Sequence, residues 1–420
     1  MSLPTRQGDL AGPLSRSTIA GIRAAADEDA QSVTALVGEL VRVPSRSGLD
    51  PYGPIIDLME GWLRDHGLRP RRLTSSTGEV VALACDVVGA YPGPRYVLDA
   101  CIDTAPFGDE AAWRHPPTAG VVEDGWLYGR GAADSKAAVA VFAHVAVRLQ
   151  KEAGALHGTL TLLYDADEHT GRFGGAKRYF AGPDAPTDVA GVMIGYPGLS
   201  KVVVGGRGFL RASLTVYGEA GHTGSGDPPA DGNAVEAAVR LVDALLEHRT
   251  PGDADPKLGL PPKLTVTAMH GGQGYSIVPD RCDVHVDVRL TSGFDATAAE
   301  ALLRQVVART NSRRDAVRPT DVQFEESWPA YRLDPSSPVC VALLEAAAHH
   351  LRPPPKPKVA GPSNIGCYLA GLGIDTTAGF GVAYRGLHGT DECIELATVP
   401  AVQSTYHQAA LRLLGRAAPQ

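Results

Sequence analysis

The stretch RYVLDACIDTAP (residues 95–106) decides the fold, because an apolar strand pattern gives way there to polar residues. An alanine-rich helical pattern follows, DSKAAVAVFAHVAVRLQKEAG (134–154). Two further strand patterns come next, GTLTLLYDADE (158–168) and VAGVMIGYPG (189–198). Strands that alternate with helices predict an α/β fold in which helices cover both faces of a sheet.

The pattern changes near residue 207. Alternating strand patterns occupy 209–218, 263–270, 282–290 and 322–331, and helical patterns occupy about 233–248 and 295–310. This β-α-β-β-α-β order predicts a ferredoxin-like α+β domain whose sheet has one solvated face. We therefore predict one α/β domain, formed by residues 1–206 and 327–420, that is interrupted by a smaller domain at 207–326.

Composition excludes several classes of protein. The chain has 420 residues, with 39 Lys+Arg against 47 Asp+Glu, which argues against nucleic-acid binding. We expect no membrane partner, because no apolar run approaches the length of a span. The first 20 or so residues, which we expect to be a loose arm, lack the apolar segment of a secretion signal. Six scattered cysteines without CxxC spacing favour a reducing cytoplasm.

Residues that could bind a metal or transfer a proton follow the predicted strands at their carboxyl ends, which is where open α/β sheets bind ligands. The segments are CID (101–103), GRGAADSK (129–136), DADEHTG (165–171), IGYP (194–197) and a late loop, GLHGTDE (386–392). Each segment alone is a weak signal, since a lone Asp after a glycine-rich turn is more often a helix cap than a ligand. Their order and spacing together are specific.

In that order the chain resembles, from about residue 30 to 415, the M20 metallopeptidases. These are co-catalytic zinc amidohydrolases that include aminoacylases, succinyl-diaminopimelate desuccinylases, acetylornithine deacetylases and glutamate carboxypeptidases. Residues 97–138 follow the layout of the family's first metal block, a His-x-Asp-x-x-Pro followed by Gly-Arg-Gly-x-x-Asp-x-Lys. DEHTG (167–171) stands at its Glu-Glu-x-Gly, GEAGHTGSGDPPADGNAVEAA (218–238) at its lid motif, and LHGTDE (387–392) at its His-x-x-x-Glu. The resemblance implies a zinc-peptidase-like mixed sheet, a lid and dimerisation domain at 207–326, and a homodimer formed through that lid.

The resemblance also implies roles for single residues. Asp134 matches the carboxylate that bridges two metal ions, and His388 matches a ligand of the first. Glu168 matches the general base that activates water, and Asp103 matches the carboxylate that supports the metal site from behind. His222 matches the lid histidine that reaches the active site of the partner subunit and stabilises the oxyanion.

Three positions depart from the family pattern. Cys101 replaces a His ligand of the second metal, His169 a Glu ligand of the first, and Tyr196 an acidic ligand of the second. Two adjacent dications need anionic ligands, and a phenol, which titrates near pH 10, is a poor one. We therefore predict one zinc ion, bound by Asp134, His169 and His388 with an open position. A metal-free site and a full dinuclear site are the alternatives.

Several roles have more than one interpretation. Cys101 is a metal ligand, a nucleophile or an inert core residue. Arg289, which matches the family's Asp-x-Arg, holds a substrate carboxylate or makes a contact between domains. Tyr196 and Asn364, the latter at a position where many members have Asp, are candidate substrate contacts. Asn233 is expected to cap the lid helix.

These assignments predict a hydrolase that cleaves the amide of a small amino-acid-derived substrate, such as an N-acyl amino acid or a dipeptide, with Glu168 as the base. One alternative is metal-independent acyl transfer, amide formation or cyclisation on the same scaffold, because the lost ligands are replaced by proton-transfer groups. The other alternative is a binding protein without catalytic activity that keeps the pocket.

Overall fold

The computed structural model describes residues 10–224, 232–314 and 318–417. Contacts divide the chain into two units. The first contains Met1–Val204, Leu333–Lys358 and Asn364–Gln420, and the second contains Gly205–Arg332 and Val359–Ser363. Among the described residues, no helix is both long and apolar enough to cross a membrane.

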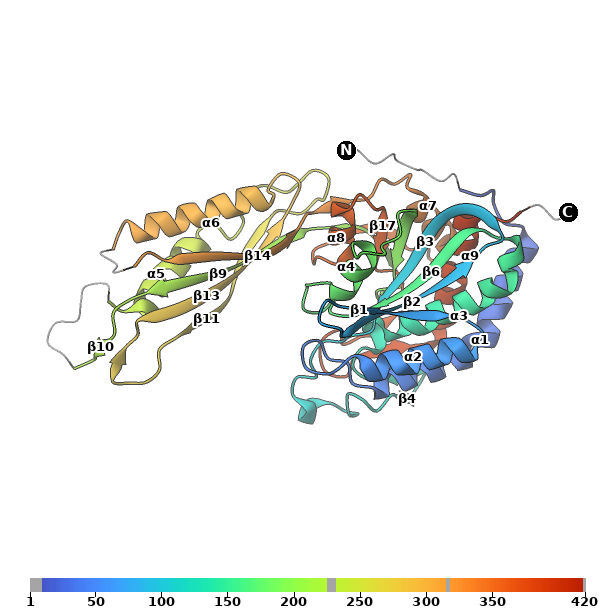
Figure 1. The fold of residues 1–420 in the computed structure, drawn as a ribbon, viewed down its shortest axis with the longest axis horizontal. Helices are drawn as coiled ribbons and strands as arrows, with labels where there is room; N and C mark the ends of the chain where they lie inside the picture. Colours follow the sequence, from blue (N-terminus) through green and yellow to red (C-terminus); the bar gives the residue numbers. More distant parts are fainter. Residues whose placement is uncertain (1–9, 225–231, 315–317, 418–420) are drawn as a thin grey trace. The chain divides into compact units, whose positions relative to one another are not determined.

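A nine-stranded mixed sheet forms the centre of the first unit (Figure 1). Its path is β1-β2-β6-β3-β7-β17-β8-β15, and β16 pairs with β8. The strands are β1 (Pro70–Thr74), β2 (Val80–Val88), β3 (Tyr91–Cys101), β6 (His157–Asp165), β7 (Val189–Ile194), β8 (Lys201–Gly206), β15 (Tyr331–Arg332), β16 (Lys356–Ala360) and β17 (Thr376–Ala378). β6, β3, β7 and β17 are parallel neighbours, so their carboxyl ends lie at one edge of the sheet. β8 and β15 pair antiparallel at Gly206 and Tyr331.

Helices cover both faces of this sheet, as predicted. They are α1 (Arg16–Arg42), α2 (Gly53–Asp65), α3 (Ala137–Glu152), α4 (Gly174–Phe180), α7 (Pro338–His350), α8 (Ile365–Gly371) and α9 (Val399–Leu414). Successive residues of β6 show the two faces, because side chains alternate along a strand. The Tyr164 hydroxyl donates to the carbonyl of Val139 in α3, whereas a side chain on Gly175 in α4 would meet the Cβ of Asp165.

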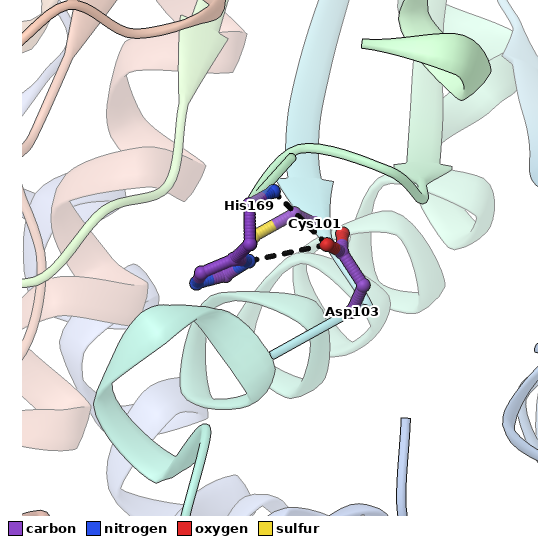
Figure 2. Close-up of side chains that lie close together, drawn as sticks. All are labelled: Cys101, Asp103 and His169. Atoms are coloured by element: carbon purple, nitrogen blue, oxygen red, sulfur yellow. Dashed lines mark hydrogen bonds and ion pairs between the residues drawn. The ribbon is translucent and has the colours of Figure 1, made fainter. Parts of the chain in front are cut away.

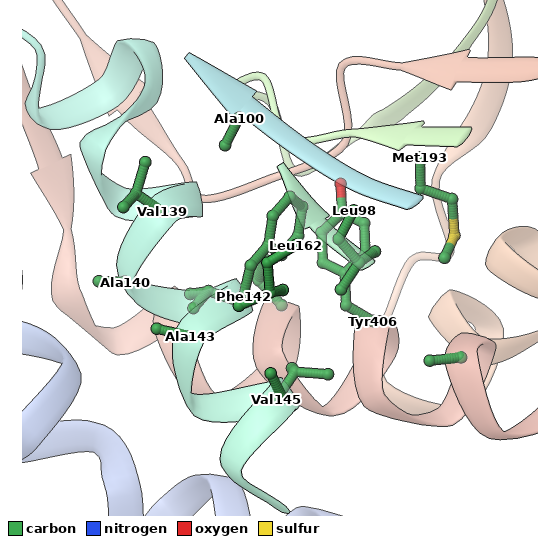
Figure 3. Close-up of a cluster of buried hydrophobic side chains, with 14 of the residues drawn as sticks. Leu98, Ala100, Val139, Ala140, Phe142, Ala143, Val145, Leu162, Met193 and Tyr406 are labelled. Atoms are coloured by element: carbon green, nitrogen blue, oxygen red, sulfur yellow. The ribbon is translucent and has the colours of Figure 1, made fainter. Parts of the chain in front are cut away.

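The core of the first unit lies between the sheet and helices α3 and α9 (Figure 3). Leu98 and Leu162 of the strands are fully buried there, and the rings of Phe142 and Tyr406 meet edge to face with 4.7 Å between centroids. Burial of such a side chain contributes about 1.5–3 kcal/mol. The alanine-rich sequence of α3 is explained by this close packing, since small side chains let the helix approach the sheet.

The first helix is longer than expected. α1 begins at Arg16, and the Ser15 side chain caps it by accepting a hydrogen bond from the backbone nitrogen of Thr18 at 3.1 Å. The predicted loose arm of about 20 residues is therefore too long. Ser15 is a favourable N-cap residue, so the sequence did contain the start signal.

The second unit has the predicted ferredoxin-like order. Its antiparallel sheet runs β11 (Lys263–Gly271), β13 (Arg281–Leu290), β9 (Gly208–Tyr217), β14 (Asp321–Trp328). Helices α5 (Ala234–Leu246) and α6 (Ala296–Asn311) pack on one face of it (Figure 1). Alternate residues of each strand face these helices, as Leu210 and Leu214 of β9 show, so the period-2 pattern is the cause of the one-sided core.

Shorter elements complete the fold. One small sheet pairs β10 (Gly221–His222) with β12 (Ile277–Val278). Another runs β18 (Tyr384–Arg385), β19 (Cys393–Glu395), β5 (Trp126–Tyr128), β4 (Val121–Glu123). Single turns of helix occur at η1 (Glu110–Ala112), η2 (Ala132–Lys136), η3 (Ala153–Ala155) and η4 (Leu396–Thr398). Because β19 pairs with β5, the loop that carries His388 lies next to the chain that leads into η2.

Candidate metal centre

The parallel strands of the first unit bring four predicted site residues to one edge of the sheet. Cys101 is the last residue of β3 and stands opposite Asp165, the last residue of β6. Asp103 follows β3 by two residues, and Glu168 follows β6 by three. Tyr196 lies two residues after β7. The site therefore lies at the carboxyl ends of the strands, as the sequence pattern indicated.

Asp134, His169 and His388 form the centre of this site. Asp134 comes from η2, immediately before α3, and its Oδ2 lies 3.0 Å from Nε2 of His388 and 3.7 Å from Nε2 of His169. One donor atom from each residue lies within 4.8 Å of the others. The His388 side chain is 54% exposed, against 9% for Asp134 and 6% for His169, so the site opens to solvent on the His388 side.

Asp103 fixes the direction of His169 (Figure 2). Its Oδ2 accepts from the backbone nitrogen of His169 at 3.0 Å and from the ring Nδ1 at 3.2 Å, while its Oδ1 accepts from the backbone nitrogen of Glu168 at 3.2 Å. A carboxylate behind a histidine in this way leaves the other ring nitrogen to a metal. That atom, Nε2, is buried and has no hydrogen-bond partner in the part of the chain that the structure describes.

Electrostatics show that the site favours positive charge. Burial by itself would lower the pKa of His169, but the carboxylates of Asp103 and Asp134 outweigh it and raise that pKa to about 11. Burial opposes ionisation of Asp134 too, yet the imidazoles of His169 and His388 beside it hold its pKa far below the usual range. Two histidines and one carboxylate with an open side form a donor set that fits a single zinc-like ion.

Glu168 lies beside this set as a carboxyl group with an unusual pKa. The Tyr196 hydroxyl donates to its Oε1 at 2.5 Å, and its Oε2 lies 3.5 Å from Nδ1 of His169. Burial raises the pKa of Glu168 to about 7, although the His169 charge opposes the rise. A carboxyl group that titrates near neutrality can both accept and return a proton, which is what a general base needs.

A second set of donor atoms, from Cys101, Asp103 and His169, also lies within 4.8 Å, but it shares His169 with the first set, and its Asp103 carboxylate already accepts three hydrogen bonds. Oδ1 of Asp134 accepts from the Ser135 hydroxyl at 2.9 Å, and the Cys101 thiol lies 3.4 Å from that hydroxyl oxygen and 4.0 Å from Oδ1. Burial and the neighbouring Asp134 raise the pKa of Cys101 well above its ordinary value, so the group is a neutral thiol. This argues against the nucleophile interpretation of Cys101, because thiolates are the reactive form.

Sequence reasoning missed an ion pair that supports the centre. Arg130 and Glu392 meet at 2.7 Å and are 2% and 1% exposed. Oε1 of Glu392 accepts from the backbone nitrogens of Ala133 at 3.0 Å and Asp134 at 3.3 Å, and Arg130 donates to the carbonyl of His388 at 3.2 Å. The pair thus holds both ligand-bearing loops. The signal was present, since both residues stand in the Gly-Arg-Gly and His-x-x-x-Glu blocks.

Three further predicted residues have local contacts of their own. His222, in the second unit, is exposed, and its Nδ1 accepts from the backbone nitrogen of Gly224 at 3.0 Å. Arg289, in the same unit, pairs with Asp287 at 2.7 Å and donates to the Ser363 hydroxyl at 3.1 Å. Asn364, in the first unit, caps α8 by accepting from the backbone nitrogen of Gly366 at 2.8 Å.

The cap predicted for the lid helix is confirmed. The Asn233 side chain accepts from the backbone nitrogens of Val235 and Glu236 at the start of α5. Part of the motif that precedes it, residues 225–231, lies outside the described residues.

Comparison with known proteins gives consistent matches. The sequence profile of peptidase family M20/M25/M40 matches residues 97–412. A succinyl-diaminopimelate desuccinylase from Xanthobacter autotrophicus is 26% identical over 380 residues, which are 89% of this chain and 96% of that protein. A tripeptidase from Staphylococcus aureus superposes with a TM-score of 0.72 at 20% identity, covering 90% of this chain and 97% of that one. A dinuclear metal binding peptidase from Bacillus subtilis gives 0.68 at 15% identity, covering 92% and 99%. At these identities, the structural matches show the fold.

Proposed function

The chain belongs to peptidase family M20/M25/M40 and is an enzyme that hydrolyses amide bonds, and on that premise we propose that it works with one metal ion. Asp134, His169 and His388 would bind that ion. The observation that carries the proposal is the convergence of their donor atoms within 4.8 Å, with Glu168 beside them. The orphaned Nε2 of His169, aimed at Asp134, supports it further.

The ion is proposed to be zinc, which accepts two imidazoles and a carboxylate with an open position. When bound, it would act as a Lewis acid that polarises the amide carbonyl and makes water a better nucleophile at neutral pH. Glu168 would take a proton from the attacking water and pass it to the leaving amine. Its pKa of about 7 supports this role, because both transfers then cost little.

The proposed substrate is a small amino-acid-derived amide, such as an N-acyl amino acid or a dipeptide. The match to a desuccinylase supports an N-acyl group. Arg289 would bind a substrate carboxylate; its guanidinium is balanced by Asp287 and is 28% exposed. Tyr196 and Asn364 are the other proposed substrate contacts. The buried position of Asn364 at the start of α8 would let its amide face a polar group of the substrate.

We propose that the enzyme is a homodimer formed through the second unit. β11 is an edge strand of the four-stranded sheet, and an unpaired edge favours pairing with another chain. Exposed apolar side chains on or near it, Met269 and Ile277, and Val239 on α5, support the same surface. In such a dimer His222 would serve the active site of the other copy as an oxyanion donor. Light scattering of the intact chain tests the dimer.

The cytoplasm is the proposed location. All six cysteines are free, including the buried Cys85, Cys282 and Cys367, and this supports a reducing compartment.

Glu168→Gln is the decisive variant. Wild-type protein is first screened on N-acyl amino acids and dipeptides, and the variant is then measured on the best substrate with its zinc content. We expect a loss of about 10²–10⁴-fold in kcat, the usual contribution of a general base, with zinc retained. Unchanged hydrolysis by the variant would show that the assignment of the base is wrong. Turnover that persists in saturating chelator would favour metal-independent acyl transfer, and ligand binding without turnover would favour a binding protein.

A further inference from the structure

We propose that hydrogen-bond donors of this chain replace the second metal ion, and that Tyr196 is the positioning residue that aims Glu168 at its water. This inference rests on the proposed function and deepens it. It starts from a disagreement, because a relative of the same fold is a dinuclear metal binding peptidase, whereas the two sets of donor atoms that converge here share His169.

The two carboxylate oxygens of Asp134 have different partners. Oδ2 faces the two imidazoles, at 3.0 Å from His388 and 3.7 Å from His169. Oδ1 faces the other way, and there it accepts a hydrogen bond from Ser135 at 2.9 Å with the Cys101 thiol at 4.0 Å. A bridging carboxylate would give one oxygen to each ion. Here the second oxygen is satisfied by neutral O–H and S–H groups of the chain.

Tyr196 likewise satisfies one oxygen of the Glu168 carboxylate with a neutral hydrogen-bond donor. Its hydroxyl donates to Oε1 at 2.5 Å, which leaves Oε2 as the oxygen that is free to take a proton from water. The other oxygen, Oε2, lies 3.5 Å from Nδ1 of the His169 ring. The hydrogen bond from Tyr196 therefore fixes Oε1 and limits the rotation of the Glu168 carboxylate toward His169.

The position of Tyr196 is fixed by close packing of the backbone around it. A side chain on Gly195 would lie 2.4 Å from the Cβ of Ala138, and one on Gly381 would lie 2.5 Å from the Tyr196 carbonyl oxygen. Both glycines are thus required for the chain to pass between α3 and the 379–382 segment. Because the backbone is held on both sides, the phenol is delivered to Glu168 with little freedom.

Charge explains why a second ion is excluded. The carboxylates beside the two altered positions already accept hydrogen bonds, Asp103 from His169, Asp134 from Ser135 and Glu168 from Tyr196. Cys101 and Tyr196 would each have to lose a proton to bind an ion. A thiol and a phenol ordinarily keep their protons at neutral pH. A second dication close to the first needs anionic ligands to offset their repulsion. In place of anionic ligands, the chain provides hydrogen bonds that would have to break before a second ion could bind.

The first experiment uses Tyr196→Phe, with zinc counted by elemental analysis and kcat and KM measured separately on the best wild-type substrate. We expect one zinc per chain in both proteins and an unchanged KM, because the phenyl ring that would contact the substrate is kept. The kcat should fall by about 10–100-fold, since a hydrogen bond to a charged group contributes about 1.5–3 kcal/mol. Tyr164→Phe is the matched control. It loses a buried hydroxyl that donates to a backbone carbonyl below the site, and its kcat should stay unchanged. An unchanged kcat in Tyr196→Phe, or a loss of its zinc, would overturn the proposal.

The second experiment restores the family's ligand types in the double variant Cys101→His/Tyr196→Asp. Dialysed against zinc chloride, folded double variant should retain two zinc ions per chain where the wild type retains one. Two ions in the wild type, or one ion in the folded variant, would contradict the replacement. If the double variant does not fold, the wild-type zinc count and the Tyr196→Phe kinetics decide the question alone.

The results also separate this inference from the proposed function. An inactive Glu168→Gln with a fully active Tyr196→Phe would overturn the role of Tyr196 and leave the hydrolase intact. An active Glu168→Gln would overturn the proposed base itself, whatever Tyr196→Phe does.

Discussion

Arg130 and Glu392 lie 262 residues apart in the chain and form an ion pair, with 2.7 Å between Nη1 of Arg130 and Oε2 of Glu392. Both side chains are almost fully buried. Glu392 holds the loop of Asp134 through two backbone nitrogens, and Arg130 holds the loop of His388 through the carbonyls of His388 and Gly389. His388 has a left-handed backbone, with φ of 59°, which a residue other than glycine adopts at a cost. The ion pair stabilises this conformation.

Glu392→Gln should therefore lower both stability and metal affinity. Removal of one partner leaves a buried charge without compensation, which costs about 3–5 kcal/mol in the free energy of unfolding. We expect zinc affinity to fall about 10–100-fold as well, because groups that orient ligands have effects of that size. Urea unfolding and zinc titration measure the two effects. Glu300→Gln is the control, because its pair with Arg304 is on the surface and should contribute about 0–1 kcal/mol.

Asp103→Asn should weaken zinc binding while the fold persists. The amide keeps one oxygen, so it cannot accept from both backbone nitrogens and the His169 ring as the carboxylate does. A loss of about 10–100-fold in zinc affinity is expected, measured by competition with a chelator of known affinity. Asp109→Asn, which changes an exposed cap of η1, should leave the affinity unchanged. Equal affinities in all three proteins would contradict the supporting role of Asp103.

Metal removal should stop hydrolysis and leave the protein folded. The core between the sheet, α3 and α9 contains no ligand residue, so its packing does not depend on an ion. Zinc present at about 100 times its dissociation constant would add about 2.7 kcal/mol to the free energy of unfolding, and dialysis against chelator should lower Tm by several degrees. Circular dichroism and differential scanning calorimetry test this. A chelated protein without secondary structure would show that the ion has a structural role.

The contribution of His407 should lower stability in mild acid. Burial lowers the pKa of His407 from 6.5 to about 4, so between these values the unfolded chain binds a proton that the folded chain does not. Folding is therefore penalised as pH falls through this window, by about 2 kcal/mol at pH 5 for this residue. Urea unfolding at pH 7.5 and pH 5.0 measures the difference. His407→Gln should reduce it, and His66→Gln, at an exposed imidazole, should leave it as in the wild type.

The sequence predicted where the site lies better than it predicted the contacts between the side chains of the site. Strand-end motifs placed Asp103 and Glu168 together because carboxyl ends of parallel strands share an edge. The acids 165, 167 and 168 stand close together in the DADEHTG segment, but they have different surroundings. Asp165 is fully buried on the α4 face, and Asp167 accepts from the Thr170 hydroxyl in a turn. Alternation along β6 turns Asp165 away from the face of Tyr164, whereas Asp167 and Glu168 lie after the end of the strand.

The contacts that tune the site could not be predicted from the sequence. Ser135 reaches Oδ1 of Asp134 through the irregular backbone of η2, and no periodic pattern specifies that geometry. The bond from Tyr196 to Glu168 depends on the spacing between β6 and β7, which are joined only through β3. Such contacts follow from tertiary packing, whereas residue types and their order are local information.

The pairing of β8 with β15 has a consequence for how this molecule is built. The chain leaves the large sheet after Gly206 and returns to it at Tyr331, and these two residues are direct partners in an antiparallel ladder. Their Cα atoms are therefore only about 4.5–5.5 Å apart, a gap that a two-residue turn closes. In topological terms residues 207–330, which form nearly all of the second unit, are an elaborated hairpin loop. Exchange of this loop for that of a relative would not change the hydrogen-bond register of the large sheet. The strand ends that carry the site would therefore keep their positions.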